Sequence, residues 1–350
     1  MPNAHSFNRE VQGKPVRLYT ITGGGLLMQV TNYGAKIVSL MVPDANGRKA
    51  DIVLGFSTLE EWLSQETYFN GINGRCTGRV SGGHFSLDGT VYELVRNSGE
   101  NALHGGLHGF NEKVWDVQES SARHITMHYR SEAGEEGYPG NLDVWVTYRL
   151  TGAPALNISY KAVTDAPTIL NLTNHAYFNL KGEGEGDIRD HRLQVFADEY
   201  IPYDETVAPT GEVLPVEGTP MDFRNPVTIA DRIDTPFFAM GRGIDNGWAL
   251  PGWREYRMDS KRLQRAAVLS GGGRTMEVWT TFPCMQVYSG NYVERYVGKS
   301  GRMYDVQHAV CMEAQDFPDS INHPLFPSPV LRPGETFSGV CEYRFSDTVV

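Results

Sequence analysis

Cysteine is scarce in this chain of 350 residues. The four that occur are too few for a disulfide-stabilised scaffold, and no two of them share the C-x-x-C spacing typical of zinc ribbons. They are Cys76, Cys284, Cys311 and Cys341. We therefore expect free thiols, as in proteins of the reducing cytoplasm.

The chain also has fewer basic than acidic residues and no long apolar run. The chain has 31 Lys and Arg against 42 Asp and Glu, a net charge of −11. Nucleic acid and anionic membranes are poor partners for such a chain, because both bind through basic patches. No apolar run approaches the 18 residues of a membrane span, and residues 1–12 do not read as a secretory signal. We therefore expect a cytoplasmic protein that binds neither nucleic acid nor a membrane.

Several common catalytic motifs are missing. The chain has no G-x-G-x-x-G, no P-loop and no G-x-S-x-G, so dinucleotides, ATP and serine hydrolysis are not indicated. No H-E-x-x-H pattern occurs among the ten histidines. His124 and His128 alternate onto one face of an expected strand without a third ligand, so we predict no metal site.

Turn formers and strand-favouring aromatic residues are plentiful. The 38 Gly and 19 Pro occur with many stretches of alternating apolar and polar residues, as in 144–150 and 156–160. Asp88-Gly89 and the turn at 44–47 predict tight hairpins, because type I′ turns need positive φ at both central positions. One short helix is expected over 58–64. The pattern predicts a large antiparallel β-sandwich forming one domain over residues 1–350.

Four segments concentrate polar side chains that could do chemistry. They are Asn101–Gly106, Asn171–Asn179, Gly243–Trp248 and Cys311–Asp319. Each also has a plain structural interpretation as a turn, a hydrogen-bonded network or a surface carboxylate. In the last segment, apolar neighbours should desolvate Glu313 and raise its pKa.

Taken together, these segments resemble the aldose 1-epimerase (galactose mutarotase) family. The similar stretches run in order along nearly the whole chain, and their number makes the resemblance specific. They are Thr31–Ala35, Asp51–Phe56, Gly74–Val80, Asn101–Gly106, Glu136–Gly140, Asn171–Leu180, Gln286–Asn291, Glu313–Pro318, Asn322–Pro324 and Leu331–Glu335.

The resemblance implies a cofactor-free isomerase that interconverts the α and β anomers of a free aldose such as galactose or glucose. By position in the motifs, His175 is the general acid and Glu313 the general base. The remaining site positions bind the sugar: Arg79, His104, Tyr177, Asp245 and Gln286. These residue types suit the reaction, since ring opening needs one proton removed from the C1 hydroxyl and one delivered to the ring oxygen.

Some positions depart from the family pattern. Gly78 stands where the family often has Asn, Asn246 and Trp248 follow Asp245 where His and Phe or Tyr are common, and Ala314 replaces a common Pro. These changes leave the preferred sugar open. Three alternatives also remain: an epimerase for a phosphorylated hexose, with Arg75 and Arg79 at the phosphate; a non-catalytic sugar-binding module; and a polysaccharide-active enzyme.

Overall fold

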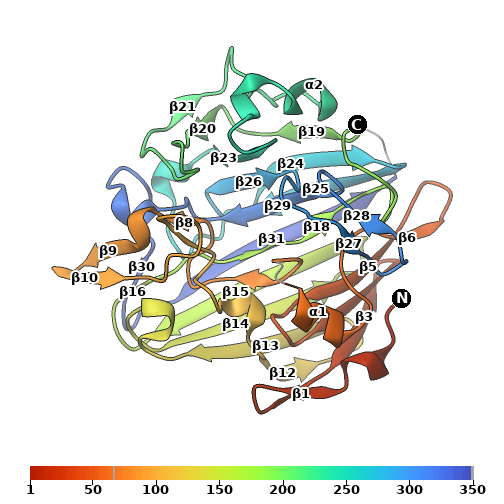
Figure 1. Ribbon diagram of the computed structural model, residues 1–350, viewed down its shortest axis with the longest axis horizontal. Coiled ribbons are helices and arrows are strands. Elements are labelled where there is room, and N and C mark those ends of the chain that lie inside the picture. The colour runs from red at the N-terminus through yellow and green to blue at the C-terminus, as the bar shows by residue number, and fades with distance from the viewer. Residues whose placement is uncertain (66–67, 348–350) are drawn as a thin grey trace.

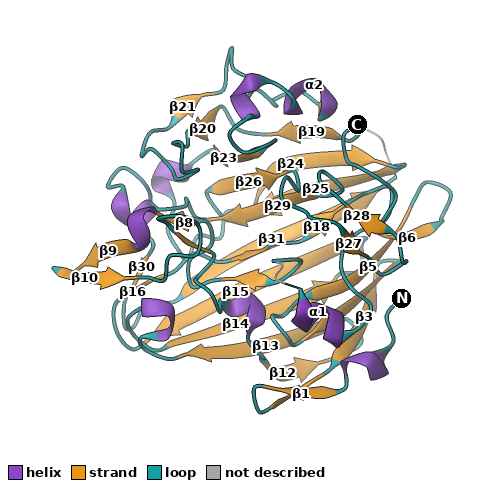
Figure 2. Ribbon diagram, viewed as in Figure 1, coloured by secondary structure: helices purple, strands orange, loops and turns teal. Residues whose placement is uncertain are grey.

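The computed structural model describes residues 1–65 and 68–347. Strands make up 43% of the chain and helices 9% (Figure 2). The expected all-β architecture is confirmed, and paired strands in every sheet run antiparallel.

The largest sheet has nine strands, which lie side by side from β12 to β22 (Figure 1). In spatial order they are β12 (Asp116–Ser120), β13 (His124–Ser131), β14 (Leu142–Leu150), β15 (Ala155–Thr164), β31 (Phe337–Ser346), β25 (Arg274–Thr280), β24 (Gln264–Gly271), β19 (Arg192–Val195) and β22 (Val227–Thr228). Strand β31, late in the sequence, thus occupies the centre of the sheet between β15 and β25.

A six-stranded and a four-stranded sheet complete the main layers. The six-stranded sheet has the order β18 (Tyr177–Phe178), β29 (Val310–Gln315), β26 (Cys284–Tyr288), β23 (Asp245–Ala249), β20 (Glu199–Ile201) and β21 (Leu214–Pro215). The four-stranded sheet is β3 (Leu18–Gly23), β4 (Leu26–Thr31), β5 (Ile37–Pro43) and β6 (Lys49–Asp51).

Short strand pairs and single-turn helices fill the connections. The pairs are β1 (Arg9–Val11) with β2 (Lys14–Val16), β7 (Ile72–Asn73) with β17 (Thr173–Asn174), β8 (Arg79–Val80) with β11 (Ala102–Leu103), β9 (His84–Leu87) with β10 (Thr90–Glu93), β16 (Thr168–Ile169) with β30 (Val330–Leu331), and β27 (Tyr296–Val297) with β28 (Met303–Tyr304). The helices are α1 (Leu59–Ser64) and α2 (Ala230–Ile233), with 3-10 turns at Ala4–Phe7, Ser81–Gly83, Phe110–Glu112, Glu135–Gly137, Pro236–Phe238, Trp253–Glu255 and Ser320–Asn322.

The main core lies between the nine-stranded and six-stranded sheets. Apolar side chains from both layers form one buried cluster, with Tyr148 on β14 and Met312 on β29 among its members. The layers are also joined directly, because the Tyr343 hydroxyl on β31 donates to the Met312 carbonyl at 3.0 Å. Its ring packs edge-on against Phe178 at 5.0 Å. One face of the six-stranded sheet is therefore committed to the core.

The predicted local signals appear where expected. Helix α1 starts after Thr58, whose side chain caps the backbone N–H of Glu61 while the Glu61 carboxylate accepts from Thr58 in return. The Asp88-Gly89 turn joins β9 to β10, with positive φ at both residues. His124 and His128 lie on one face of β13, but each pairs with a carboxylate, Glu119 and Asp143.

All four cysteines are buried and free. Within residues 1–65 and 68–347, no helix has the length and apolar character needed to cross a membrane.

Candidate active site

Strand β29 sorts its side chains into two sets by simple alternation. Met312 and Ala314 enter the main core, whereas Glu313 and Gln315 line a pocket on the other side of the strand. On the neighbouring strand β26, Gln286 stands directly opposite Glu313 in the ladder. Because side chains alternate along a strand, residues two apart share a face. The pocket floor is therefore a row of polar groups backed by an apolar core.

In the polar segment 171–179, some side chains hold the fold together and others line the pocket. The Asn174 amide donates to the Asn70 carbonyl at 2.9 Å, and the Asn70 side chain accepts from the Tyr177 backbone N–H at 2.9 Å. These amides satisfy backbone groups, as buried polar groups must. His175 and Tyr177, which follow Asn174 in the same segment, line the pocket. The structural and the functional interpretations of this segment both hold, for different residues.

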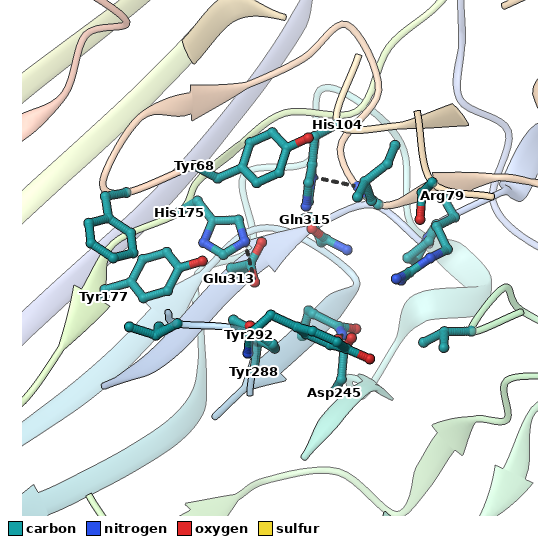
Figure 3. Close-up of a pocket in the computed structure, with 18 of the residues that line it drawn as sticks. Tyr68, Arg79, His104, His175, Tyr177, Asp245, Tyr288, Tyr292, Glu313 and Gln315 are labelled. Carbon is teal, nitrogen blue, oxygen red and sulfur yellow. Dashed lines mark hydrogen bonds and ion pairs between the residues drawn. The ribbon is translucent and has the colours of Figure 1, made fainter. Parts of the chain in front are cut away.

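His175 and Glu313 form a buried pair in the pocket wall. Nε2 of His175 lies 3.5 Å from Oε1 of Glu313, and both side chains are at most 5% exposed (Figure 3). The Tyr177 ring stacks on the imidazole at 5.0 Å. Nδ1 of His175 has no hydrogen-bond partner among the described residues. The imidazole is thus held largely by packing, with the Glu313 carboxyl beside its Nε2.

Burial sets the protonation of this pair. It lowers the pKa of His175 to about 3. It also raises the pKa of Glu313 well above its usual range, with the nearby Asp245 charge adding to the effect. Both shifts follow from the cost of placing charge in a low-dielectric site. The raised pKa expected for Glu313 from its apolar neighbours is thus found, and burial disfavours the charged form of both groups.

His104 is fixed as a hydrogen-bond donor to the pocket. The backbone N–H of Gly78 donates to its Nδ1 at 3.2 Å, so Nδ1 is the acceptor and Nε2 carries the proton. Burial, together with the charges of His175 and Arg79, lowers its pKa and keeps the ring neutral. Nε2 points into the pocket (Figure 3).

Asp245, Gln286 and Tyr203 form a hydrogen-bonded chain across the floor. The Tyr203 hydroxyl donates to Oε1 of Gln286 at 2.7 Å, and Nε2 of Gln286 donates to Oδ1 of Asp245 at 2.7 Å. Gly247 lies opposite Gln286 in the ladder, and a Cβ there would come within 3.1 Å of the Tyr203 hydroxyl. The glycine therefore makes room for Tyr203. The chain presents a carboxylate of fixed orientation to the pocket.

Arg79 and Arg75 have different roles despite their proximity in sequence. Arg79 lines the pocket, and its Nε is buried without a partner among the described residues. Arg75 is 1% exposed and donates to Ser131, Thr168 and backbone carbonyls away from the pocket. One of the two arginines considered for a phosphate is thus a structural residue.

The pocket has a volume of about 700 Å³, within the usual range for small-molecule sites. Aromatic rings wall the polar floor, as in many ligand sites. These rings belong to Tyr68, Tyr177, Tyr203, Tyr288 and Tyr292, with Phe69 and Tyr296 beside them. Among the described lining residues, Arg79 is the one basic group besides the two histidines, against Asp245, Glu294 and Glu313.

A group of metal-binding side chains also occurs here. One atom each of His175, Cys311 and Glu313 lie within 4.8 Å of one another, and zinc accepts all three types. However, metal ligands must be deprotonated, and burial raises the pKa of both the Cys311 thiol and Glu313. The donor set therefore fits a cation poorly, and the absence of a metal site stays a prediction.

All seven residues singled out in the sequence line this one pocket: Arg79, His104, His175, Tyr177, Asp245, Gln286 and Glu313. Sequence reasoning missed Gln315, although it lies in a segment already singled out and alternation places it on the face of Glu313. Tyr203 was also missed, and no local signal marked it.

The chain is similar to known proteins along most of its length. A sequence model of the aldose 1-epimerase family matches residues 17–344. The chain is 39% identical to galactose mutarotase of Homo sapiens over 335 residues, 95% of each chain. It is 33% identical to aldose 1-epimerase of Escherichia coli K12 over 341 residues, covering 95% of this chain and 96% of the other. A solved structure of galactose 1-epimerase from Lactobacillus acidophilus superposes with a TM-score of 0.83 at 27% identity, covering 97% and 96%.

Proposed function

The chain belongs to the aldose 1-epimerase family, and on that premise we propose that it interconverts the α and β anomers of a free aldose such as galactose or glucose. The observation that carries the proposal is the His175–Glu313 pair, 3.5 Å apart and buried in a polar pocket of about 700 Å³. The anomeric hydroxyl and the ring oxygen are bonded to the same carbon. The acid and the base must therefore act on neighbouring oxygens, and one pocket wall holds both groups.

Glu313 is the proposed base and His175 the proposed acid. The Glu313 carboxylate removes the C1 hydroxyl proton, the bond between C1 and the ring oxygen breaks, and its electron pair goes to the ring oxygen. That oxygen takes the proton from Nε2 of His175, which leaves an aldehyde. Rotation about C1–C2 presents the other face of the aldehyde, and the reverse transfers close the ring.

The protonation of the pair fits this cycle. Ring opening starts with ionised Glu313 and protonated His175 and ends with protonated Glu313 and neutral His175. Both states hold one proton in total, so no exchange with solvent is required. Burial favours the second, uncharged arrangement, which is the arrangement that accompanies the open-chain sugar. Hydroxyls of the bound sugar compensate the first, charged arrangement.

Sugar binding is proposed to rest on four polar groups and one ring. Asp245, Gln286, Arg79 and His104 face the pocket with donors and acceptors for hydroxyls, and Tyr177 supplies an apolar wall. Acceptor-only, donor-only and mixed groups are all represented, which suits hydroxyls that both donate and accept.

The charge of the pocket supports a neutral sugar over a phosphorylated one. A phosphate would need several basic groups, and Arg75, one of the two candidates, binds backbone carbonyls elsewhere. A non-catalytic binding module is disfavoured because it would have no use for a buried acid–base pair. We also propose a single domain, a monomer or weak dimer, and a cytoplasmic location, which the four free cysteines support.

Polarimetry tests the proposal. Freshly dissolved α-D-galactose and α-D-glucose are followed with the protein, without it, and with the double variant His175→Asn/Glu313→Gln. We expect acceleration by the parent protein and none above background by the double variant. Unchanged rates for every free aldose would refute the proposal.

A further inference from the structure

Gln315 is a buried amide with no role in the free protein. It is the last residue of β29, it is 1% exposed, and it lines the pocket two positions beyond Glu313. Neither its Nε2 nor its Oε1 finds a hydrogen-bond partner among the described residues. Gln286, the neighbouring amide on the floor, engages both of its polar atoms. A buried amide left unpaired is unfavourable unless something binds it.

A second unpaired donor comes from a different element. Nε of Arg79, on β8, is also buried without a partner among the described residues, and Arg79 lines the same pocket. In Figure 3 the side chains of Gln315 and Arg79 lie on the same side of Glu313, away from Tyr177.

The backbone around these two residues is tied together. The Asn171 side chain donates to the carbonyls of Thr77 at 3.4 Å and Asp316 at 3.1 Å, and it accepts from the Asp316 N–H at 2.9 Å. Thr77 precedes Arg79 by two residues, and Asp316 follows Gln315 directly. The backbone segments that carry Gln315 and Arg79 are therefore held together, and we call the part of the pocket between these two side chains the corner.

A second tie closes this corner. Ser81 donates to the Asp319 carboxylate through both its backbone N–H, at 3.1 Å, and its hydroxyl. Between the ties, Gly78 packs so closely on the loop after β29 that a Cβ would come within 2.8 Å of the Pro318 ring. With a φ of 73°, position 78 also favours glycine.

We propose that Gln315, together with Arg79, forms a hydroxyl-binding subsite for adjacent ring hydroxyls of the sugar. The inference rests on the proposed function. An amide offers a donor and an acceptor in one plane, so it pairs with a hydroxyl that accepts and another that donates. Two residues along a strand span about 6.7 Å, which places the subsite away from the C1 hydroxyl at Glu313. Gln315 is thus assigned to selecting the sugar rather than to proton transfer.

The variant Gln315→Met tests the assignment, because Met keeps the length and volume and removes both polar atoms. We expect the KM for galactose and glucose to rise about tenfold, the loss typical of neutral hydrogen bonds, while kcat changes far less. The thermal midpoint of the free protein should stay the same or rise, since an unpaired buried amide is removed. A structural role predicts the reverse: a lower midpoint with an unchanged KM.

Gln29→Met is the matched control. Gln29 is also buried, and its Nε2 donates to the Pro2 carbonyl at 3.2 Å, but it does not line the pocket. Its replacement should lower the thermal midpoint and leave KM unchanged.

Monodeoxy sugars identify the hydroxyls. Galactose and glucose lacking the hydroxyl at C2, C3, C4 or C6 are compared with the parent sugars, by KM and by sugar-induced thermal stabilisation. A deoxy sugar that lacks a hydroxyl bound by Gln315 should bind the parent protein more weakly than the complete sugar does. Gln315→Met should bind that deoxy sugar and the complete sugar with equal affinity. Equal losses in both proteins at every position, or an unchanged KM in Gln315→Met, would overturn the subsite.

The two proposals fail separately. If the parent protein does not accelerate mutarotation, the proposed function is wrong, and thermal stabilisation still reports whether Gln315 binds the sugar. If the parent is active and Gln315→Met matches it in both measurements, the subsite alone is wrong.

Discussion

The two faces of β29 show how differently burial acts on neighbouring residues. Met312 and Glu313 are adjacent in the chain and 1% and 2% exposed. Met312 packs into the main core, where burial of apolar surface stabilises the fold. Glu313 faces the pocket, where the same exclusion of water raises its pKa and costs stability. Side chains on one face of the strand stabilise the fold. Side chains on the other face, such as Glu313, are held in the pocket at a cost in stability.

Replacing the proton-transfer pair should have the largest effect on rate and little effect on stability. Glu313→Gln and His175→Asn keep approximate size and remove proton transfer. Each should lower kcat about 10²–10⁴-fold, and the double variant should lose less than the product because the two groups act as a unit. Steady-state polarimetry with circular dichroism as a folding control measures this. Near-normal kcat in Glu313→Gln would move the base elsewhere, with Asp245 the next candidate.

The core face should respond in the opposite way. Met312→Ala removes buried contacts and leaves a cavity, so we expect the free energy of unfolding to fall by about 2–5 kcal/mol. Sugar affinity, measured by KM below the unfolding temperature, should stay close to that of the parent. Denaturant titration provides the stability. A large rise in KM without loss of stability would show that the two faces are not separable.

The pH profile should show the shifted protonation of the pair. The active form holds one proton, so kcat should be flat around neutral pH and fall tenfold per unit outside a broad plateau. The acid limb reflects a second proton on the pair, because burial lowers the pKa of His175 to about 3. The alkaline limb reflects loss of the single proton, because the pKa of Glu313 is raised. An acid limb centred near the ordinary His value of about 6.5 would contradict this.

Removing the Arg79 guanidinium should mainly weaken binding. Arg79→Ala deletes donors that face sugar oxygens in the ground state and the transition state alike, and such uniform binding appears in KM. We expect KM to rise about 10- to 100-fold with a smaller change in kcat. Abolished turnover at an unchanged KM would instead show that Arg79 stabilises the charge that develops at the ring oxygen.

Asp316→Asn should leave turnover unchanged and alter only the pH dependence of stability. Burial raises the pKa of Asp316 to about 7, above the unfolded value of about 3.9. The folded state therefore holds a proton that the unfolded state loses first, and stability falls as pH rises from about 4 to about 7. In Asp316→Asn this part of the slope should disappear. Thermal midpoints at pH 4.5 and 8 measure it, and parallel shifts at both would refute it.

Sequence patterns predicted the site well where the information is local. The apolar neighbours of Glu313 predicted its desolvation, and the family motifs indicated the seven residues that meet in the pocket. Asp88-Gly89 and Thr58 fixed a hairpin and a helix start through their own backbone chemistry.

Other features depend on contacts between distant segments. Arg75 and Arg79 lie close together in the sequence and have the same side chain. Hydrogen bonds from Arg75 to Ser131 and Thr168, far along the chain, show that Arg75 has a structural role. The direction of the His175 pKa shift depends on how completely the surrounding layers exclude water. Gln315 could be placed on a face, but the absence of partners for its amide among the described residues appears only in the folded structure.

The central place of β31 has a consequence for biosynthesis. The middle of the nine-stranded sheet stays open between β15 and β25 until residues 337–346 have emerged from the ribosome. Such long-range pairing makes folding slow. A nascent chain that stops short of β31 should therefore be inactive and prone to association, and chaperone dependence should end with the synthesis of that strand.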